Sequence, residues 1–180
     1  SKFRRENIGY IYQDYSLIPE YTAYENIVLP LILDNKDIDG DEVRELMSSL
    51  QIEYCYEKYP YEMSGGEQQR VAIARALINH PAVVYADEPT GNLDSKNSHK
   101  VLKILSHLNQ TGTTILLVTH DAMIASYAKT MMYLYDGGIQ TVIHKHQDTQ
   151  IEFFKNINSI TTQDSLLKEF SQDVLPENDL

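Results

Sequence analysis

The segment VVYADE, residues 83–88, runs four β-branched, aromatic or small residues into two adjacent carboxylates, Asp87 and Glu88. An apolar run of this length without polar alternation is typical of a strand buried in a parallel sheet. Open α/β sheets bind ligands at the carboxyl ends of such strands. One acid there can hold Mg²⁺, and the next can polarise a water that attacks a phosphoryl group. A solvated Asp-Glu turn is the plain alternative.

Similar apolar runs recur along the chain, and helical patterns alternate with them. The runs cover residues 8–12, 82–86, 114–118 and 131–135, and the helical patterns cover residues 66–79, 95–109 and 122–129. Strands that alternate with amphipathic helices predict an α/β fold whose parallel sheet is buried on both faces. After the last run, Asp136-Gly137-Gly138 predicts a hairpin at the sheet edge.

The charge is unevenly distributed. The 180 residues carry 15 Lys and Arg against 26 Asp and Glu, a formal net charge of −11. Residues 34–62 hold three bases against nine acids and residues 145–180 three against seven, whereas residues 63–144 hold six of each. This acidity argues against sequence-independent nucleic-acid binding, which needs clustered Lys and Arg. The single cysteine, Cys55, excludes a disulfide scaffold and fits a reducing compartment.

The segment SGGEQQR, residues 64–70, opens one of the helical patterns. Ser64 and Glu67 have the S-x-x-E spacing of a capping box, which would explain both as the start of a helix. The same N-terminus, with Gly65 and Gly66, would also offer backbone N–H groups and a partial positive charge to an anion such as phosphate. The two interpretations are compatible, because both use one geometry.

Two further polar residues follow predicted strands. His120 comes after the run at residues 114–118, and a parallel sheet would bring it to the edge that carries Asp87 and Glu88. A lone histidine at a strand end is more often structural, so its place beside two carboxylates is what makes it a candidate. Gln13 follows the first strand. A lone glutamine indicates little by itself, so Gln13 is a candidate only together with the carboxylates, the glycines and the histidine.

Three motifs together carry a family resemblance. SGGEQQR at residues 64–70, VVYADEPTGNLD at residues 83–94 and LLVTHD at residues 116–121 resemble, in order and spacing, the ATP-binding domain of ABC transporters. The resemblance runs from Arg4 to Ile143. It implies a P-loop NTPase-type, mostly parallel sheet with an inserted helical subdomain, and ATP and Mg²⁺ as cofactors.

The resemblance assigns nucleotide contacts in the first half of the chain. Gln13 matches the Q-loop glutamine, which touches Mg²⁺ and the attacking water. Ser64, Gly65, Gly66 and Gln68 lie in the signature loop, which binds the γ-phosphate of ATP held by the opposite subunit.

It also assigns the reacting groups. Asp87 matches the Walker B aspartate, which holds Mg²⁺, and Glu88 matches the catalytic base. Asp94 matches the D-loop of the dimer interface, and His120 matches the switch histidine that contacts the γ-phosphate. The expected catalytic residues are therefore Glu88, His120 and Gln13.

A narrower resemblance comes from IGYIYQDYSLIPEYTAYENIVLPL at residues 8–31 together with GNLD at residues 91–94. These runs are similar to the subgroup of macrolide, lipoprotein-release and antimicrobial-peptide exporters. The resemblance implies an ATP-hydrolysing subunit that is cytoplasmic and peripheral on the inner face of the plasma membrane. Its expected partners are a second ATP-binding subunit in a homodimer sandwich and a separate membrane permease, with no nucleic acid.

The 180 residues contain no G-x-x-x-x-G-K-S/T loop, the phosphate cradle of this fold. We therefore expect a truncated ATP-binding domain at residues 1–144 that lacks the N-terminal strands, with its helical subdomain at residues 14–62. Residues 145–180 are expected to be an acidic C-terminal extension. The parent protein would be an ATPase and this chain alone inactive, and the alternative is a non-catalytic fragment that acts only in dimerisation or partner binding.

Overall fold

The computed structural model describes residue 4 and residues 7–172, with side chains up to residue 162. The chain forms two compact units, one that ends at Val118 and one that begins at Thr119. The sequence predicts a different boundary, after residue 144. That prediction concerns where the ATP-binding domain ends and not how the chain divides into compact units.

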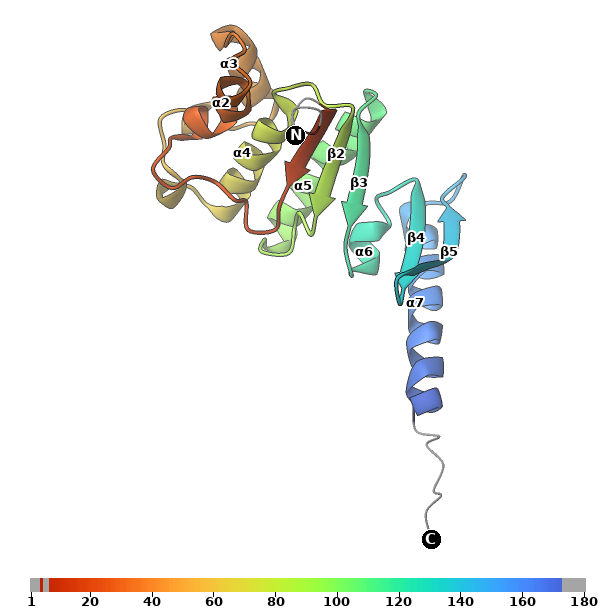
Figure 1. The fold of residues 1–180 in the computed structure, drawn as a ribbon. Helices are drawn as coiled ribbons and strands as arrows, with labels where there is room; N and C mark the ends of the chain where they lie inside the picture. Colours follow the sequence, from red (N-terminus) through yellow and green to blue (C-terminus); the bar gives the residue numbers. More distant parts are fainter. Residues whose placement is uncertain (1–3, 5–6, 173–180) are drawn as a thin grey trace. The chain divides into compact units, whose positions relative to one another are not determined.

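The first unit is built on three parallel strands, β1 (Ile8–Ile11), β2 (Val83–Asp87) and β3 (Thr114–Val118). Their order in the sheet is β1-β2-β3, so that β2 is hydrogen-bonded on both sides (Figure 1). Tyr85 of β2 lies opposite Tyr10 on one side and Leu116 on the other. The predicted α/β class and all three strands are confirmed, and no strand end differs by more than one residue.

Helices fill the connections between these strands. Between β1 and β2 lie α2 (Ala23–Leu33), α3 (Gly40–Ser49), the 3₁₀ turns η1 (Glu53–Cys55) and η2 (Pro60–Glu62), and α4 (Gly65–Leu77). Between β2 and β3 lies α5 (Ser95–Gln110). α2 begins at a capping box in which the Glu25 backbone N–H donates to Thr22 Oγ1 over 3.2 Å and the Thr22 N–H donates to Glu25 Oε2 over 2.7 Å.

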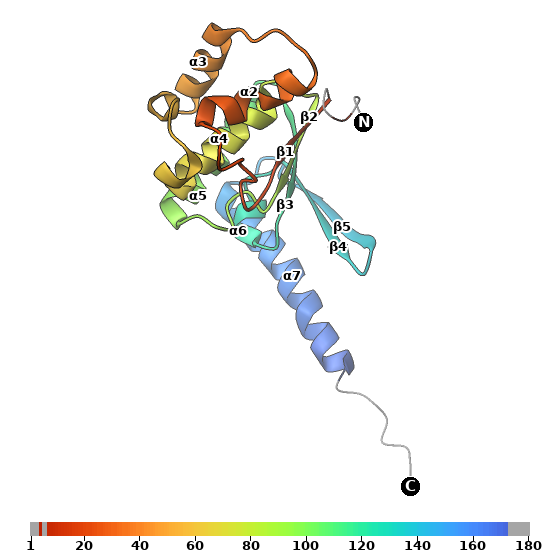
Figure 2. The ribbon, with the colours of Figure 1, turned by 60° about the vertical axis from the view of Figure 1, so that its left-hand side comes forward.

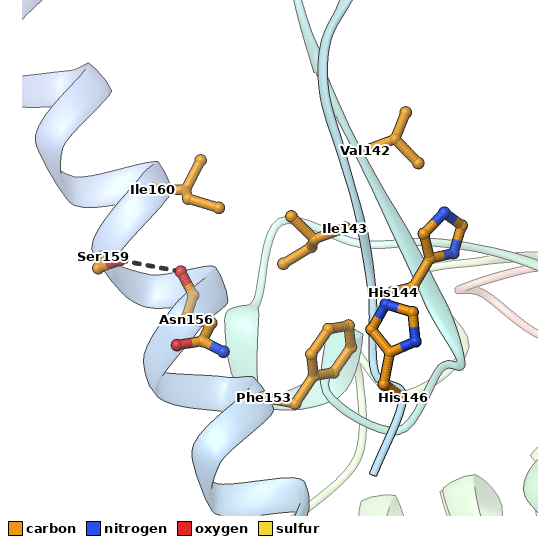
Figure 3. Close-up of a pocket in the computed structure, with 8 residues that line it drawn as sticks. All are labelled: Val142, Ile143, His144, His146, Phe153, Asn156, Ser159 and Ile160. Atoms are coloured by element: carbon orange, nitrogen blue, oxygen red, sulfur yellow. Dashed lines mark hydrogen bonds between the residues drawn. The ribbon is translucent and has the colours of Figure 1, made fainter. Parts of the chain in front are cut away.

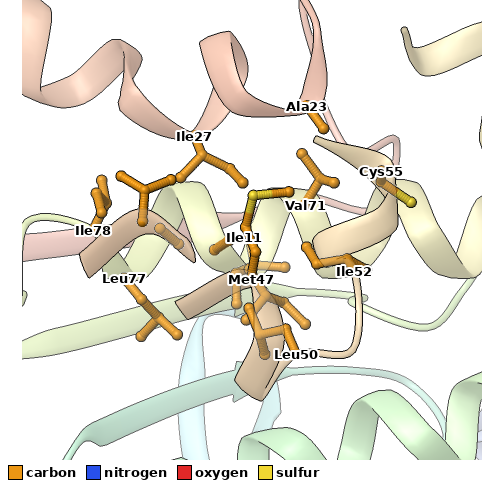
Figure 4. Close-up of a cluster of buried hydrophobic side chains, with 14 of the residues drawn as sticks. Ile11, Ala23, Ile27, Met47, Leu50, Ile52, Cys55, Val71, Leu77 and Ile78 are labelled. Carbon is orange, nitrogen blue, oxygen red and sulfur yellow. The ribbon is translucent and has the colours of Figure 1, made fainter. Parts of the chain in front are cut away.

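These helices lie on one face of the sheet (Figure 2). Ile11, Val84 and Ala86 point to this face and are fully buried. α4 packs on β1 and α2, and α5 packs on α4 and β3. The core between them is apolar and includes Ile27, Met47, Leu50, Ile52, Val71, Leu77 and Ile78 (Figure 4).

Among the described residues of the first unit, no helix covers the opposite face of the sheet. Tyr10 and Tyr85 lie there with ring centroids 5.9 Å apart, and Leu116 is 51% exposed. The prediction of a sheet buried on both faces is therefore wrong for this unit. Each connection from one parallel strand to the next is a right-handed crossover. When every new strand is added on the same side of the sheet, as in the order β1-β2-β3, all connecting helices lie on one face, and helices cover both faces only where the strand order reverses.

The second unit contains α6 (Ala122–Ala125), β4 (Thr130–Tyr135), β5 (Gly138–His144) and α7 (Gln150–Gln172). The predicted hairpin is confirmed, because β4 and β5 pair antiparallel and the turn residues Asp136 and Gly137 have φ of 48° and 74°. Its predicted place at the sheet edge stays a prediction. Among the described residues, β4 and β5 form a two-stranded sheet of their own.

Two helices of this unit differ from their predicted extents. α6 ends after one turn and not at residue 129, and the Ser126 hydroxyl bonds back to the Met123 carbonyl at 2.6 Å. α7 starts at Gln150 and lies within residues 145–180, which the sequence analysis describes only as an acidic C-terminal extension. A capping box of Thr149 and Glu152 begins α7.

The second unit has its own small core. Phe153 and Ile157 of α7 are buried against Met131 of β4. Among the described residues of the whole chain, no helix is both long and apolar enough to cross a bilayer.

The close packing of α4 on β1 can be tested by a substitution at Gly9. A Cβ at Gly9 would overlap the Ala76 carbonyl oxygen of α4 and lie 3.2 Å from Pro81 Cγ, whereas a Cβ at Gly40 meets nothing within 4 Å. We expect Gly9→Ala to destabilise the chain by about 1–3 kcal/mol through overpacking, and Gly40→Ala to change the free energy of unfolding by less than about 0.5 kcal/mol. Urea unfolding of both variants checks this, and equal midpoints would contradict it.

Candidate functional site

The two carboxylates lie where the central strand ends. Asp87 is the last residue of β2, and Glu88 follows it in a left-handed backbone conformation with φ of 43°. The Glu88 N–H donates to the Val118 carbonyl of β3 over 2.9 Å, and the Gly91 N–H donates to the Glu88 carbonyl over 3.0 Å. A non-glycine residue in this region is strained and persists only where its surroundings hold it. Hydrogen bonds on both sides therefore fix the peptide that carries Glu88.

The segment after Glu88 leads into α5 through Asp94. Asp94 is the N-cap of that helix, with the Asn97 N–H donating to Oδ1 over 2.9 Å and the Asn97 side-chain amide donating to Oδ2 over 2.7 Å. These hydrogen bonds from Asn97 lower the pKa of Asp94. Asp94 therefore has a structural role within the chain, and its role at a dimer interface stays a prediction.

The capping box predicted at the start of α4 is confirmed. Ser64 donates to Glu67 Oε2 both from its backbone N–H, over 2.7 Å, and from its hydroxyl, over 2.6 Å. In return the Glu67 N–H donates to Ser64 Oγ over 3.4 Å. The Gln68 side chain donates to the Met63 carbonyl over 3.1 Å and so secures the turn that precedes the helix. Anion binding at this N-terminus stays a prediction.

Glu67 is also tied to the segment around η1. Its Oε1 lies 3.6 Å from Cys55 Sγ and 4.0 Å from Lys58 Nζ, and the Tyr54 hydroxyl donates to the carboxylate. Burial raises the pKa of Glu67, but the hydrogen bonds from Ser64 and Tyr54 outweigh it and lower the pKa to about 2. Burial is the main cause that raises the pKa of Cys55 to about 11, and the negative charge of the nearby Glu67 raises it further in the same direction. Cys55 is therefore a packed thiol and not a nucleophile.

Three glycines allow separate segments of the site to meet. A Cβ at Gly65 would lie 2.7 Å from the Tyr15 hydroxyl, and one at Gly66 would lie 2.8 Å from the Asn97 side chain. A Cβ at Gly91 would lie 2.7 Å from Gln13 Nε2. Gly65 and Gly66 thus make room for side chains of this chain, whether or not a ligand also approaches them.

Gln13 is held against the segment that follows Glu88. Besides the contact of its side chain with Gly91, its carbonyl accepts a 2.9 Å hydrogen bond from the Asn92 side chain. The structure therefore brings together three of the predicted segments, around Gln13, around Gly65 and Gly66, and at residues 91–94. The local sequence signals gave no indication that Gln13 would contact residues almost 80 positions away.

His120 lies two residues after the end of β3 and belongs to the second unit. Its approach to Glu88 stays a prediction.

Two site residues were missed by the sequence analysis. Gln69 of α4 is fully buried and donates from Nε2 to the Pro89 carbonyl over 2.7 Å. Arg75 donates to the carbonyls of Tyr15 and Ser16, over 2.7 and 2.5 Å, and so holds two residues with positive φ. The sequence did contain a signal for Gln69. A side-chain amide on the core-facing side of an amphipathic helix is buried, and a buried amide is expected to have a hydrogen-bond partner.

The second unit holds a separate hollow of about 480 Å³ between β5 and α7. Figure 3 shows the rings of His144 and His146 beside Phe153 at this hollow; the two histidine ring centroids are 5.8 Å apart. His144 Nδ1 lies 3.0 Å from the hydroxyl of Thr130. Among the described residues no three His, Cys, Asp or Glu side chains cluster as a metal site would require.

The chain belongs to the ABC transporter family, since the sequence model of that family matches residues 1–91. It is 46% identical over 158 residues to the uncharacterized ABC transporter ATP-binding protein YvcR of Bacillus subtilis, covering 86% of this chain and 61% of YvcR. It is 39% identical over 160 residues to the bacitracin export ATP-binding protein BceA of Halalkalibacterium halodurans, covering 87% of this chain and 63% of BceA. The chain thus spans about three fifths of the length of these relatives.

A solved structure confirms the fold class. The ATP-binding cassette MJ0796 of Methanocaldococcus jannaschii, solved as a dimer in a post-hydrolysis state with ADP and Pi, matches with a TM-score of 0.69 and 41% identity. The match covers 79% of this chain and 65% of that chain. The family match and this structure confirm the predicted resemblance to ABC ATP-binding domains, and the match to BceA confirms the resemblance to the exporter subgroup.

The pKa of Glu67 makes the start of α4 sensitive to acid. Because the folded-state pKa is about 2, below the ordinary value of 4.5, ionised Glu67 contributes stability that is fully present above pH 4.5 and lost as the pH falls towards 2. We expect Glu67→Gln to cost about 1 kcal/mol near neutral pH, and the difference from wild type to shrink between these two pH values.

Urea unfolding at a series of pH values measures this difference. Glu45→Gln, which removes an exposed carboxylate from the middle of α3, is the control for the change in net charge. A gap between wild type and Glu67→Gln that is the same at every pH would contradict the assignment.

Proposed function

We propose that this chain is part of the ATP-hydrolysing subunit of an export-type ABC transporter that powers a separate membrane permease. The observation that carries the proposal is the pair Asp87 and Glu88 at the carboxyl end of the central strand, with the Glu88 peptide fixed in a strained turn. Membership of the ABC transporter family supports it. Relatives named for ATP binding, one of them for bacitracin export, support it further.

In this proposal Glu88 is the general base. Its carboxylate follows directly on the strand end, where it would accept a proton from the water that attacks the γ-phosphate. His120 would contact the same phosphate. The half-buried position of Glu88, neither solvated nor sealed, suits a group that must meet a water and a nucleotide.

Asp87 and Gln13 are the residues that would hold Mg²⁺. Mg²⁺ in nucleotide sites takes one or two carboxylates, together with substrate phosphates and waters, so the single half-buried carboxylate of Asp87 fits. The Gln13 side chain lies beside Gly91, and the hydrogen bond from Asn92 to the Gln13 carbonyl keeps this residue close to the segment after Glu88. When bound, Mg²⁺ would neutralise charge on the phosphates.

The start of α4 would bind ATP held by a second subunit. Ser64, Gly65, Gly66 and Gln68 lie at a capped helix N-terminus, which favours an anion through its partial positive charge. Asp94 would lie at the interface between the two subunits. The dimeric structure of MJ0796 supports a homodimer, and the residue-level contacts are our proposal.

The subunit would act at the cytoplasmic face of the plasma membrane, bound to the permease and not to nucleic acid. The formal net charge of −11 disfavours binding to phosphate backbones in general. Residues 63–144, which carry most of the proposed nucleotide contacts, hold six bases and six acids. The acidity therefore lies mostly outside the region that ATP must approach.

A second function is favoured by one observation, the absence of a G-x-x-x-x-G-K-S/T loop in the 180 residues. Backbone N–H groups and the lysine of that loop supply the main hold on the nucleotide in this fold. These residues by themselves would then act as a non-catalytic module in dimerisation or partner binding.

Glu88→Gln tests the ATPase proposal in the complete gene product assembled with its permease. We expect kcat for ATP hydrolysis to fall by about 10²–10⁴-fold, the usual contribution of a general base, while ATP binding is retained. Phosphate release measures the rate, and Glu152→Gln in the second unit is the control. Unchanged turnover in Glu88→Gln would rule out the assignment.

Calorimetric titration of the 180-residue chain with Mg-ATP tests the second function. We expect no binding in the micromolar range, because the chain holds no P-loop lysine. A micromolar Kd would show that these residues hold ATP by themselves and would exclude the purely non-catalytic role.

A further inference from the structure

Gln69 connects α4 to the turn that carries Glu88. Its side chain is fully buried, and Nε2 donates to the Pro89 carbonyl over 2.7 Å across 20 residues of sequence. Pro89 is buried as well, so water does not replace this donor. The orientation of the amide follows from chemistry, since only its nitrogen can donate to a carbonyl oxygen.

The peptide that Gln69 reaches is the strained one. Glu88 has φ of 43°, and its own N–H and C=O bond to Val118 and Gly91. The Gln69 side chain adds a third hydrogen bond, to the Pro89 carbonyl. Residues 88 and 89 are therefore held by hydrogen bonds to β3, within the turn itself and to α4. Such strain persists where several neighbours over-determine the conformation.

Packing alone does not explain an amide at this position. Gln69 Oε1 is buried and has no hydrogen-bond partner among the described residues, which is costly for a polar atom. Methionine has nearly the same shape, fills such a site without that cost, and would be preferred if only volume mattered. The amide is therefore retained for the one bond it makes, to Pro89.

We propose that Gln69 is a positioning residue for Glu88, which holds the turn at residues 88 and 89 so that the carboxylate points towards the nucleotide. This inference rests on the proposed function, because it assigns Gln69 a role only through the base. Gln69 lies on the helix that begins at Ser64, so it also links the helix that would bind one ATP to the turn that would activate water at the other.

The test uses Gln69→Met in the complete gene product with its permease, and Gln110→Met, an exposed glutamine at the end of α5, as the matched control. We expect kcat for ATP hydrolysis to fall about tenfold in Gln69→Met, with KM for ATP unchanged, since the turn and not the nucleotide contacts is altered. Gln110→Met should behave as wild type. Equal kcat in the two variants would overturn the proposal.

A double-mutant cycle with Glu88→Gln separates positioning from general damage. If Gln69 acts through Glu88, adding Gln69→Met to Glu88→Gln lowers the residual turnover no further. Multiplied losses would show that Gln69 acts independently of the base, and would overturn the proposal. If Glu88→Gln alone leaves turnover unchanged, the proposed function itself fails, which is a distinct result.

A measurement on the 180-residue chain needs no activity. We expect Gln69→Met to speed hydrogen exchange of the Glu88 amide, which donates to Val118, and of the Gly91 amide, which donates to Glu88, more than about tenfold relative to amides of α5. Gln69→Leu, which leaves neither a donor nor an acceptor at this buried position, should do the same and serves if Gln69→Met does not fold. Unchanged protection at Glu88 would overturn the proposal.

Discussion

The pairing of β2 between β1 and β3 is the constraint on which the first unit depends. Both edges of β2 are hydrogen-bonded, so its alternate residues Val84 and Ala86 are pressed into the core beneath α4 and its last residue, Asp87, is delivered to the end of the sheet. The bond from the Glu88 N–H to Val118 extends the same pairing one residue beyond the strand. The position of the carboxylates is thus a consequence of strand pairing and not of local turn preference.

α4 joins the other parts of the site to this frame. Its N-terminus is closed by Ser64 and Glu67, its buried face meets the core through Val71, and Gln69 reaches the turn after Glu88. Glu67 in turn contacts the segment around η1. One helix therefore links the connection between β1 and β2, the candidate phosphate-binding loop and the candidate base.

Much of this could be predicted from local signals. β-branched and aromatic runs predict β2 and β3 to within a residue, and the S-x-x-E spacing predicts the capping box of Ser64 and Glu67, because both depend on neighbours in the sequence. The hairpin around Asp136 followed from its turn residues for the same reason. The open face of the sheet was not predicted, since it follows from the direction of successive crossovers.

The sequence by itself determined the class of the fold, the order of the chemical motifs and the family, because strand and helix periodicity and motif spacing are local properties of a chain. Only the tertiary structure decided that Gln13 lies against Gly91, that Glu67 is charged down to a pH of about 2, and that Gln69 bonds to Pro89. These contacts join residues that chain folding alone brings within a few ångströms. The energies of hydrogen bonds and burial depend on that distance and not on separation along the sequence.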